Sequence, residues 1–147
     1  MLASAKCAAV VALAAFWSSA AQAQITVSGD PALMKISAAV AGGTPASVSN
    51  ALTTYTVTKP GSGSWTITAQ LNTVMPAGVT LTTSFAASSG AASAGTVTLT
   101  TAAVKVVTGI TKKQSNETIT YTLSATPAAG VVSLQTRRVT LTAVAAP

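Results

Sequence analysis

Apolar and polar side chains alternate along much of this chain, most regularly near its C-terminus. From Glu117 to Ala125 the apolar residues fall at every second position, with threonine or serine between them. This period of two is that of a β-strand with one buried face. The alternation stops at the turn residues 126–130 and resumes from Arg138 to Ala143. We therefore predict a β-hairpin with a long loop between these two runs.

Shorter runs of the same kind occur upstream, separated by glycine, proline, serine and asparagine. The predicted strands cover residues 24–28, 33–41, 52–59, 64–71, 79–85, 96–101 and 104–107. Residues 86–95 contain little but alanine, serine and glycine, which predicts a mobile loop or an excursion at a sheet edge. About seven to nine short strands and no confident helix after residue 23 predict an all-β chain with an antiparallel, immunoglobulin-like β-sandwich.

Two aromatic residues add detail to this prediction. Trp65 shares its strand face with Ile67 and Leu71, which favours a core position, and the alternative is an exposed platform for sugar rings. Tyr121 lies two residues before Leu123, the spacing of the corner tyrosine before a core position in immunoglobulin-like domains.

The first 23 residues have the organisation of a cleavable signal peptide. Lys6 provides a basic start, residues 7–16 an apolar run, and Ala21-Gln22-Ala23 a small-x-small cleavage site. A membrane-spanning helix needs about 20 apolar residues, more than this run supplies. We predict cleavage after Ala23. A single domain, residues 24–147, is then exported to the periplasm, the cell surface or the medium, with no integral membrane segment.

Missing residue types limit the chemistry. The chain has no histidine, and its one cysteine, Cys7, is lost with the signal peptide, so no disulfide is expected. Asp30 and Glu117 are the only acidic residues, too few for a glycosidase pair and a poor basis for a calcium loop. We interpret them as a turn residue and a solvated charge. The sequence therefore predicts no catalytic, cofactor or metal site, and a protein that is not an enzyme.

The net charge of +6, which becomes +5 without Lys6, reflects few acids rather than many bases, since 7% of residues are charged. The basic residues are scattered apart from two pairs, Lys112-Lys113 and Arg137-Arg138. We predict that these pairs provide solubility or weak contacts with anionic surface polymers. Nucleic acid is not a predicted partner, because a dense basic patch with interspersed aromatic residues is absent.

Residues 24–147 resemble the secreted immunoglobulin-like sandwich proteins of bacteria, among them fimbrial and spore-coat-type surface subunits. The resemblance is carried by the alternating segments Gln24–Val27 and 138–144, and the chain departs from many pilins in lacking a cysteine pair and an aromatic residue near the C-terminus. It implies a structural or surface protein that associates with itself or with a surface protein through strand edges.

For that association we predict an N-terminal extension strand within residues 24–41 that pairs with a neighbour's sheet edge. Its alternating apolar side chains are Ile25, Val27, Met34, Ile36 and Val40. The alternative function is a monomeric binding module for a polysaccharide or another surface ligand. That alternative predicts an exposed aromatic cluster built from Tyr55, Trp65, Phe85 or Tyr121.

Overall fold

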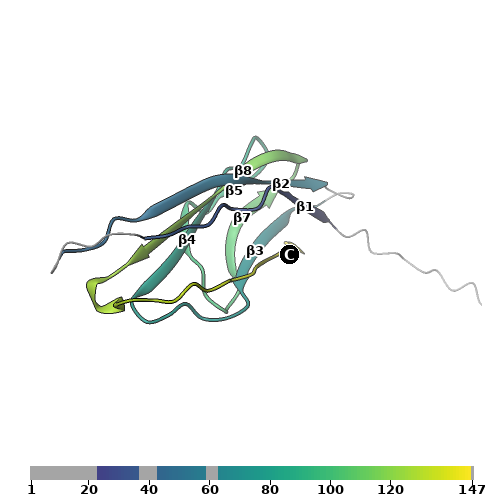
Figure 1. The fold of residues 1–147 in the computed structure, drawn as a ribbon. Helices are drawn as coiled ribbons and strands as arrows, with labels where there is room; N and C mark the ends of the chain where they lie inside the picture. Colours follow the sequence, from purple (N-terminus) through teal and green to yellow (C-terminus); the bar gives the residue numbers. More distant parts are fainter. Residues whose placement is uncertain (1–22, 37–42, 59–62, 147) are drawn as a thin grey trace, which may run out of the picture.

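The computed structural model describes residues 23–36, 43–58 and 63–146, which form two antiparallel β-sheets (Figure 1). The first sheet has the order β1 (Gln24–Ser28), β2 (Val48–Thr58), β8 (Gln114–Ala125), β4 (Val79–Phe85), β6 (Thr96–Thr98). The second has the order β5 (Ala92–Ser93), β7 (Val104–Ile110), β3 (Trp65–Leu71), β9 (Val139–Ala145). A short 3-10 helix, η1 (Pro127–Ala129), follows β8. The predicted signal peptide, except for Ala23, lies outside the described residues.

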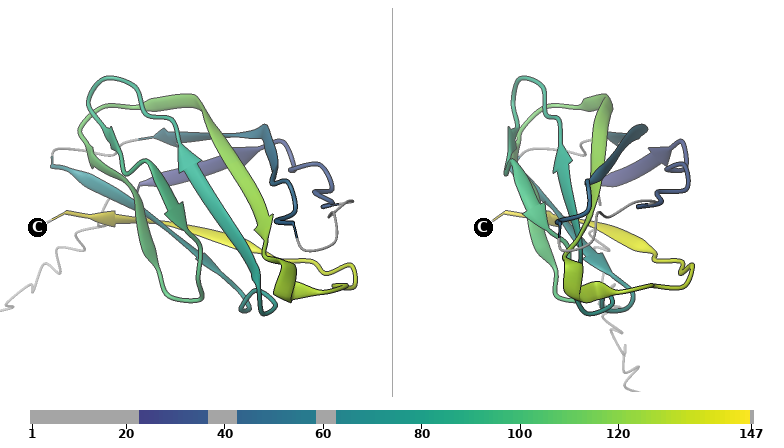
Figure 2. Two further views of the ribbon diagram at one scale, coloured as in Figure 1. Left: turned by 90° about the vertical axis from the view of Figure 1, so that its left-hand side faces the viewer. Right: turned by 60° about the vertical axis from the view of Figure 1, so that its left-hand side comes forward.

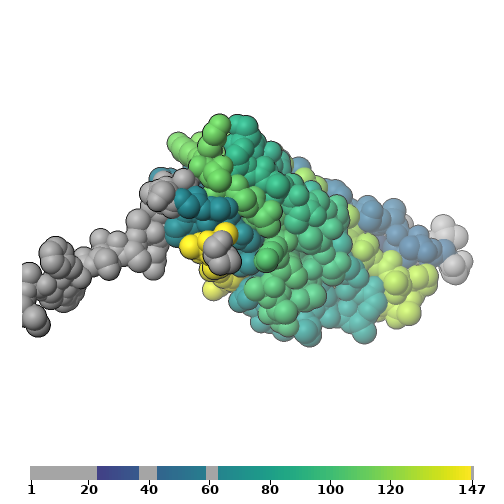
Figure 3. Space-filling model, turned by 180° about the vertical axis from the view of Figure 1, so that it is seen from behind, coloured from purple at the N-terminus to yellow at the C-terminus, as the bar shows by residue number. Residues whose placement is uncertain are grey.

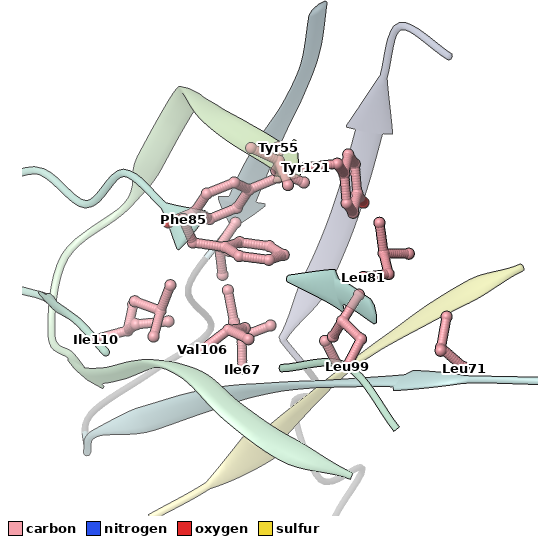
Figure 4. Packing of buried hydrophobic residues seen from close by; sticks show 13 residues of the cluster. Tyr55, Ile67, Leu71, Leu81, Phe85, Leu99, Val106, Ile110 and Tyr121 are labelled. Atoms are coloured by element: carbon pink, nitrogen blue, oxygen red, sulfur yellow. The ribbon is translucent and has the colours of Figure 1, made fainter. Parts of the chain in front are cut away.

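Side chains from both sheets meet in one hydrophobic core (Figure 4). The rings of Tyr55 on β2 and Phe85 on β4 pack with their centroids 5.4 Å apart. Ile67 on β3 and Val106 on β7 come from the other sheet and are fully buried. The predicted alternation is confirmed on β3, where Ile67, Ala69 and Leu71 are buried and Gln70 is exposed. No cysteine occurs after Cys7, so the described sheets are held by packing and hydrogen bonds without a disulfide.

The predicted hairpin between the two C-terminal runs is wrong. β8 lies between β2 and β4 in the first sheet, whereas β9 pairs with β3 in the second. The connection, residues 126–138, begins with a hydrogen bond from the Thr126 N–H to the Gly78 carbonyl (2.8 Å) and the turn of η1. It is long enough to cross the roughly 10 Å between packed sheets. Alternation specifies the buried face of a strand but not the strand beside it.

The predicted strand over residues 33–41 is absent from its described part. β1 ends at Ser28, and residues 29–36 are in no strand. Gly29 has φ +79°, and a Cβ there would lie 2.5 Å from the Leu52 carbonyl oxygen. The chain therefore turns away from β2 at a position that requires glycine. Residues 37–41 of the predicted strand lie outside the described residues.

Residues 86–95 form the predicted excursion at a sheet edge. β5 within this segment pairs with β7. The Ser88 N–H and Oγ–H both donate to Oε1 of the fully buried Gln114, at 2.9 and 3.1 Å. The amide nitrogen of Gln114 donates to the Lys112 carbonyl at 3.3 Å. One buried side chain thus fixes both this loop and the turn that carries Lys112 and Lys113.

Candidate functional site: a groove and an open strand edge

The described part of the chain contains a groove of about 1080 Å³. Its floor is the inner face of the first sheet, with Leu81 from β4 and Tyr121 and Leu123 from β8. One wall is the segment 29–36 and the other is the segment 129–139. Both views in Figure 2 show these two segments on the same side of the molecule, apart from each other.

Exposed apolar side chains are concentrated around this groove. Of the eight exposed large hydrophobic residues in the described part of the chain, five line it: Val27, Leu33, Val131, Val132 and Leu134. Leu33 and Leu134, one on each wall, are 74% and 81% exposed. A soluble domain rarely leaves a contiguous apolar surface without a use for it. The groove is therefore the strongest candidate binding surface among the described residues.

The charged residues of the groove are mainly basic. Lys35 lies on one wall and Arg137 and Arg138 on the other, with Asp30 as the single acidic lining residue. The Arg137 guanidinium is fixed, because its Nε–H donates to the Val74 carbonyl at 3.1 Å. Three of the six basic residues in the described ranges thus line one apolar groove. The predicted basic pair Arg137-Arg138 belongs to the groove, and Lys112-Lys113 does not.

The predicted assembly residues are divided between the groove and the core. Val27, Met34 and Ile36 line the groove. Ile25 packs against the hydrophobic core. β1 pairs with β2 along its whole length, from Gln24 opposite Thr58 to Ser28 opposite Thr54. Val40 lies outside the described residues. In this structure β1 thus completes its own sheet.

The aromatic side chains named by the alternative hypothesis form no exposed cluster in the described chain. Tyr55, Phe85 and Tyr121 are buried, and Trp65 is half-buried against the core. The Tyr55 hydroxyl donates to the Ala86 carbonyl at 2.6 Å. Burial, and secondarily the charge of Glu117, raises the pKa of Tyr55 to about 12. Tyr121, the predicted corner tyrosine, makes no side-chain hydrogen bond to another described residue, and burial raises the pKa of its hydroxyl.

Among the described strands, β9 pairs in its sheet with β3 alone, and it lies beside the groove. In its pairing with β3, the Asn72 N–H donates to the Arg138 carbonyl (3.0 Å) and the Ala146 N–H to the Ser64 carbonyl (2.8 Å). Hydrogen-bonded pairs alternate in an antiparallel ladder, so the even-numbered residues of β9 bond to β3. The N–H and C=O groups of the odd-numbered residues point away from β3, toward the outer edge of the sheet. These residues are Val139, Leu141, Ala143 and Ala145. β9 is an edge strand of its sheet, and the C-terminal residues lie at the border of the face in Figure 3.

Within the described residues, no group of three or more His, Cys, Asp or Glu side chains could hold a metal ion. No described helix has the length and apolar character needed to cross a bilayer. Comparison with protein-family models, with curated proteins and with solved structures finds no match to the chain.

Proposed function

We propose that this chain is a non-enzymatic, exported structural or surface protein, an immunoglobulin-like β-sandwich that associates through strand edges. The observation that carries the proposal is the outer edge of β9. It is a seven-residue strand with alternate N–H and C=O groups directed away from β3, its partner among the described strands. Such an edge is a template for pairing with another strand.

The other described sheet edges are shorter. β5 has two residues, β6 has three and β1 has five. Short edge strands are a common way of preventing edge-to-edge association. β9 is therefore the edge at which pairing would form the most hydrogen bonds.

A second copy of the chain is a suitable partner for β9. A twofold axis through Thr142 would place Leu141 opposite Ala143 of the second copy, and Val139 opposite Ala145. All four residues direct their backbone groups to the outer edge, so this register forms hydrogen-bonded pairs. Arg138 of each copy would lie beside Ala146 of the other, which keeps the two arginine pairs at opposite ends. The resulting interface is isologous and joins the two β9 sheets into one.

Light scattering over a concentration series tests the proposal with the mature protein, residues 24–147. We expect a dimer or larger species that dissociates on dilution. Ala143→Pro removes the outward N–H but none of the hydrogen bonds to β3, and Ala143→Ser is the matched control that keeps the N–H. Two symmetric hydrogen bonds are lost, each contributing about 1 kcal/mol, so the dissociation constant should rise about tenfold or more.

Urea unfolding establishes that the variants compared are folded. If Ala143→Pro does not fold, Ala145→Pro tests the same edge at an exposed position. A mature protein that stays monomeric up to its solubility limit would rule out self-association through β9. An oligomer that is equally stable in both proline variants would do the same.

A further inference from the structure

We propose that the groove binds a single-chain anionic amphiphile, with its acyl chain on the apolar floor and its head group at the basic residues of the walls. The proposal uses the side chains of the groove, of which Val139 is the one that also belongs to β9, rather than the outer backbone groups of β9. It therefore stands or fails independently of the proposed self-association.

The volume and lining of the groove suit an acyl chain. Small-molecule sites enclose about 300–1,000 Å³ and are mostly apolar, and the groove, at about 1080 Å³, lies just above that range. Leu81 and Leu123 form part of its floor, and Leu33 and Leu134 stand on opposite walls. Covering these side chains would remove the largest concentration of exposed apolar residues in the described chain from water. A polar oligosaccharide would not produce that gain.

The charge of the groove selects the head group. Lys35, Arg137 and Arg138 outnumber Asp30, so an anion is favoured over a neutral or cationic group. The hydrogen bond from the Arg137 Nε–H to the Val74 carbonyl holds this guanidinium in place at the wall. At Arg138 the structure shows a backbone hydrogen bond to the Asn72 side chain (2.9 Å) and no side-chain bond to a described residue. The Lys35 ammonium likewise makes no hydrogen bond to a described residue, so within the described part of the chain both groups can meet a carboxylate.

Isothermal titration calorimetry of the mature protein with decanoate, below its micelle concentration, tests the proposal, with decanol as the uncharged control. We expect saturable 1:1 binding of decanoate and weaker binding of decanol. The titration is repeated in the Ala143→Pro background, where β9 pairing is suppressed. Unchanged binding there is expected, because Ala143 does not line the groove.

Two exposed leucines provide a matched pair of variants. Leu134→Glu puts a negative charge on the groove wall and should weaken decanoate binding about tenfold or more. Leu52→Glu makes the same change at a leucine that is 65% exposed and lies outside the groove, and should leave binding unchanged. Equal weakening in both variants, or none in Leu134→Glu, would overturn the assignment to the groove.

The basic residues are tested by a double variant, Lys35→Gln with Arg138→Gln. It should bring decanoate affinity close to that of decanol, with Arg137 as the remaining basic residue of the groove, and leave decanol binding unchanged. Equal binding of decanoate and decanol by the unmodified protein would refute the selection of an anion. Binding only to micelles or to anionic phospholipid vesicles would also overturn the proposal. So would the absence of amphiphile binding together with an oligomer that Leu134→Glu disrupts, because the groove would then be covered by another copy of the chain.

Discussion

Replacing Thr53 by valine should stabilise the protein. Thr53 lies on the inner face of β2 and is 2% exposed, and its hydroxyl is the one buried side-chain polar atom in the described residues without a hydrogen-bond partner. It lies beside an irregularity in the β2–β8 register, between Asn50 and Thr53. A buried polar group without a partner costs about 1–3 kcal/mol, and valine has nearly the same shape as threonine. We expect Thr53→Val to raise the free energy of unfolding by about 1–2 kcal/mol.

Thr83 provides the control for this substitution. It lies on β4 in the same sheet and is 1% exposed, but its hydroxyl donates to the Thr120 carbonyl at 3.1 Å. Thr83→Val removes that hydrogen bond and should lower the free energy of unfolding by about 1 kcal/mol. Urea unfolding monitored by circular dichroism measures both changes from the transition midpoints at constant slope. If both variants shift in the same direction, the unsatisfied hydroxyl of Thr53 does not explain the result and the reasoning is refuted.

Two further predictions concern buried polar side chains. The raised pKa of Tyr55 favours its neutral form in the folded state, so stability present below pH 10 should decrease as the pH rises through about 12. Tyr55→Phe should reduce this decrease in pH-dependent urea unfolding, and an identical pH profile would contradict the assignment. Gln114→Met leaves the Ser88 N–H without its acceptor and should cost about 1–3 kcal/mol, with faster hydrogen exchange in residues 86–91. The same change at exposed Gln70 should have little effect, and equal exchange in both variants would disprove the role of Gln114.

The sequence predicted where the strands lie along the chain better than it predicted which strands lie side by side in a sheet. Period two identified the buried faces of β3 and β4, because apolar residues at alternate positions are buried together only in an extended chain. The same alternation occurs in β8 and β9, which belong to different sheets. Their neighbours are determined by the crossing connection 126–138, and its sequence has no period that indicates a direction. A hairpin and a crossing connection were therefore equally compatible with the local pattern.

The groove was harder to predict than the strands. Its walls consist largely of residues outside the helix and the strands, so neither alternation nor helical periodicity marks Leu33 or Leu134 as related. Val27, Met34 and Ile36 were selected for another reason, as parts of an N-terminal strand, and the structure brings them to the groove. The signal that could have been used was compositional: apolar residues at positions 131, 132 and 134 within a segment otherwise interpreted as a loop.

The distribution of threonine explains why the groove differs from the rest of the surface. On the strands, threonine alternates with apolar residues, so the outer faces of the sheets carry side chains suited to both strand geometry and water. Five of the eight exposed large hydrophobic residues of the described chain lie outside the strands: Leu33, Val74, Val131, Val132 and Leu134. No sheet periodicity requires these positions to be apolar. Their exposure therefore has no explanation in strand formation, whereas contact with an apolar ligand at the groove accounts for the four that line it.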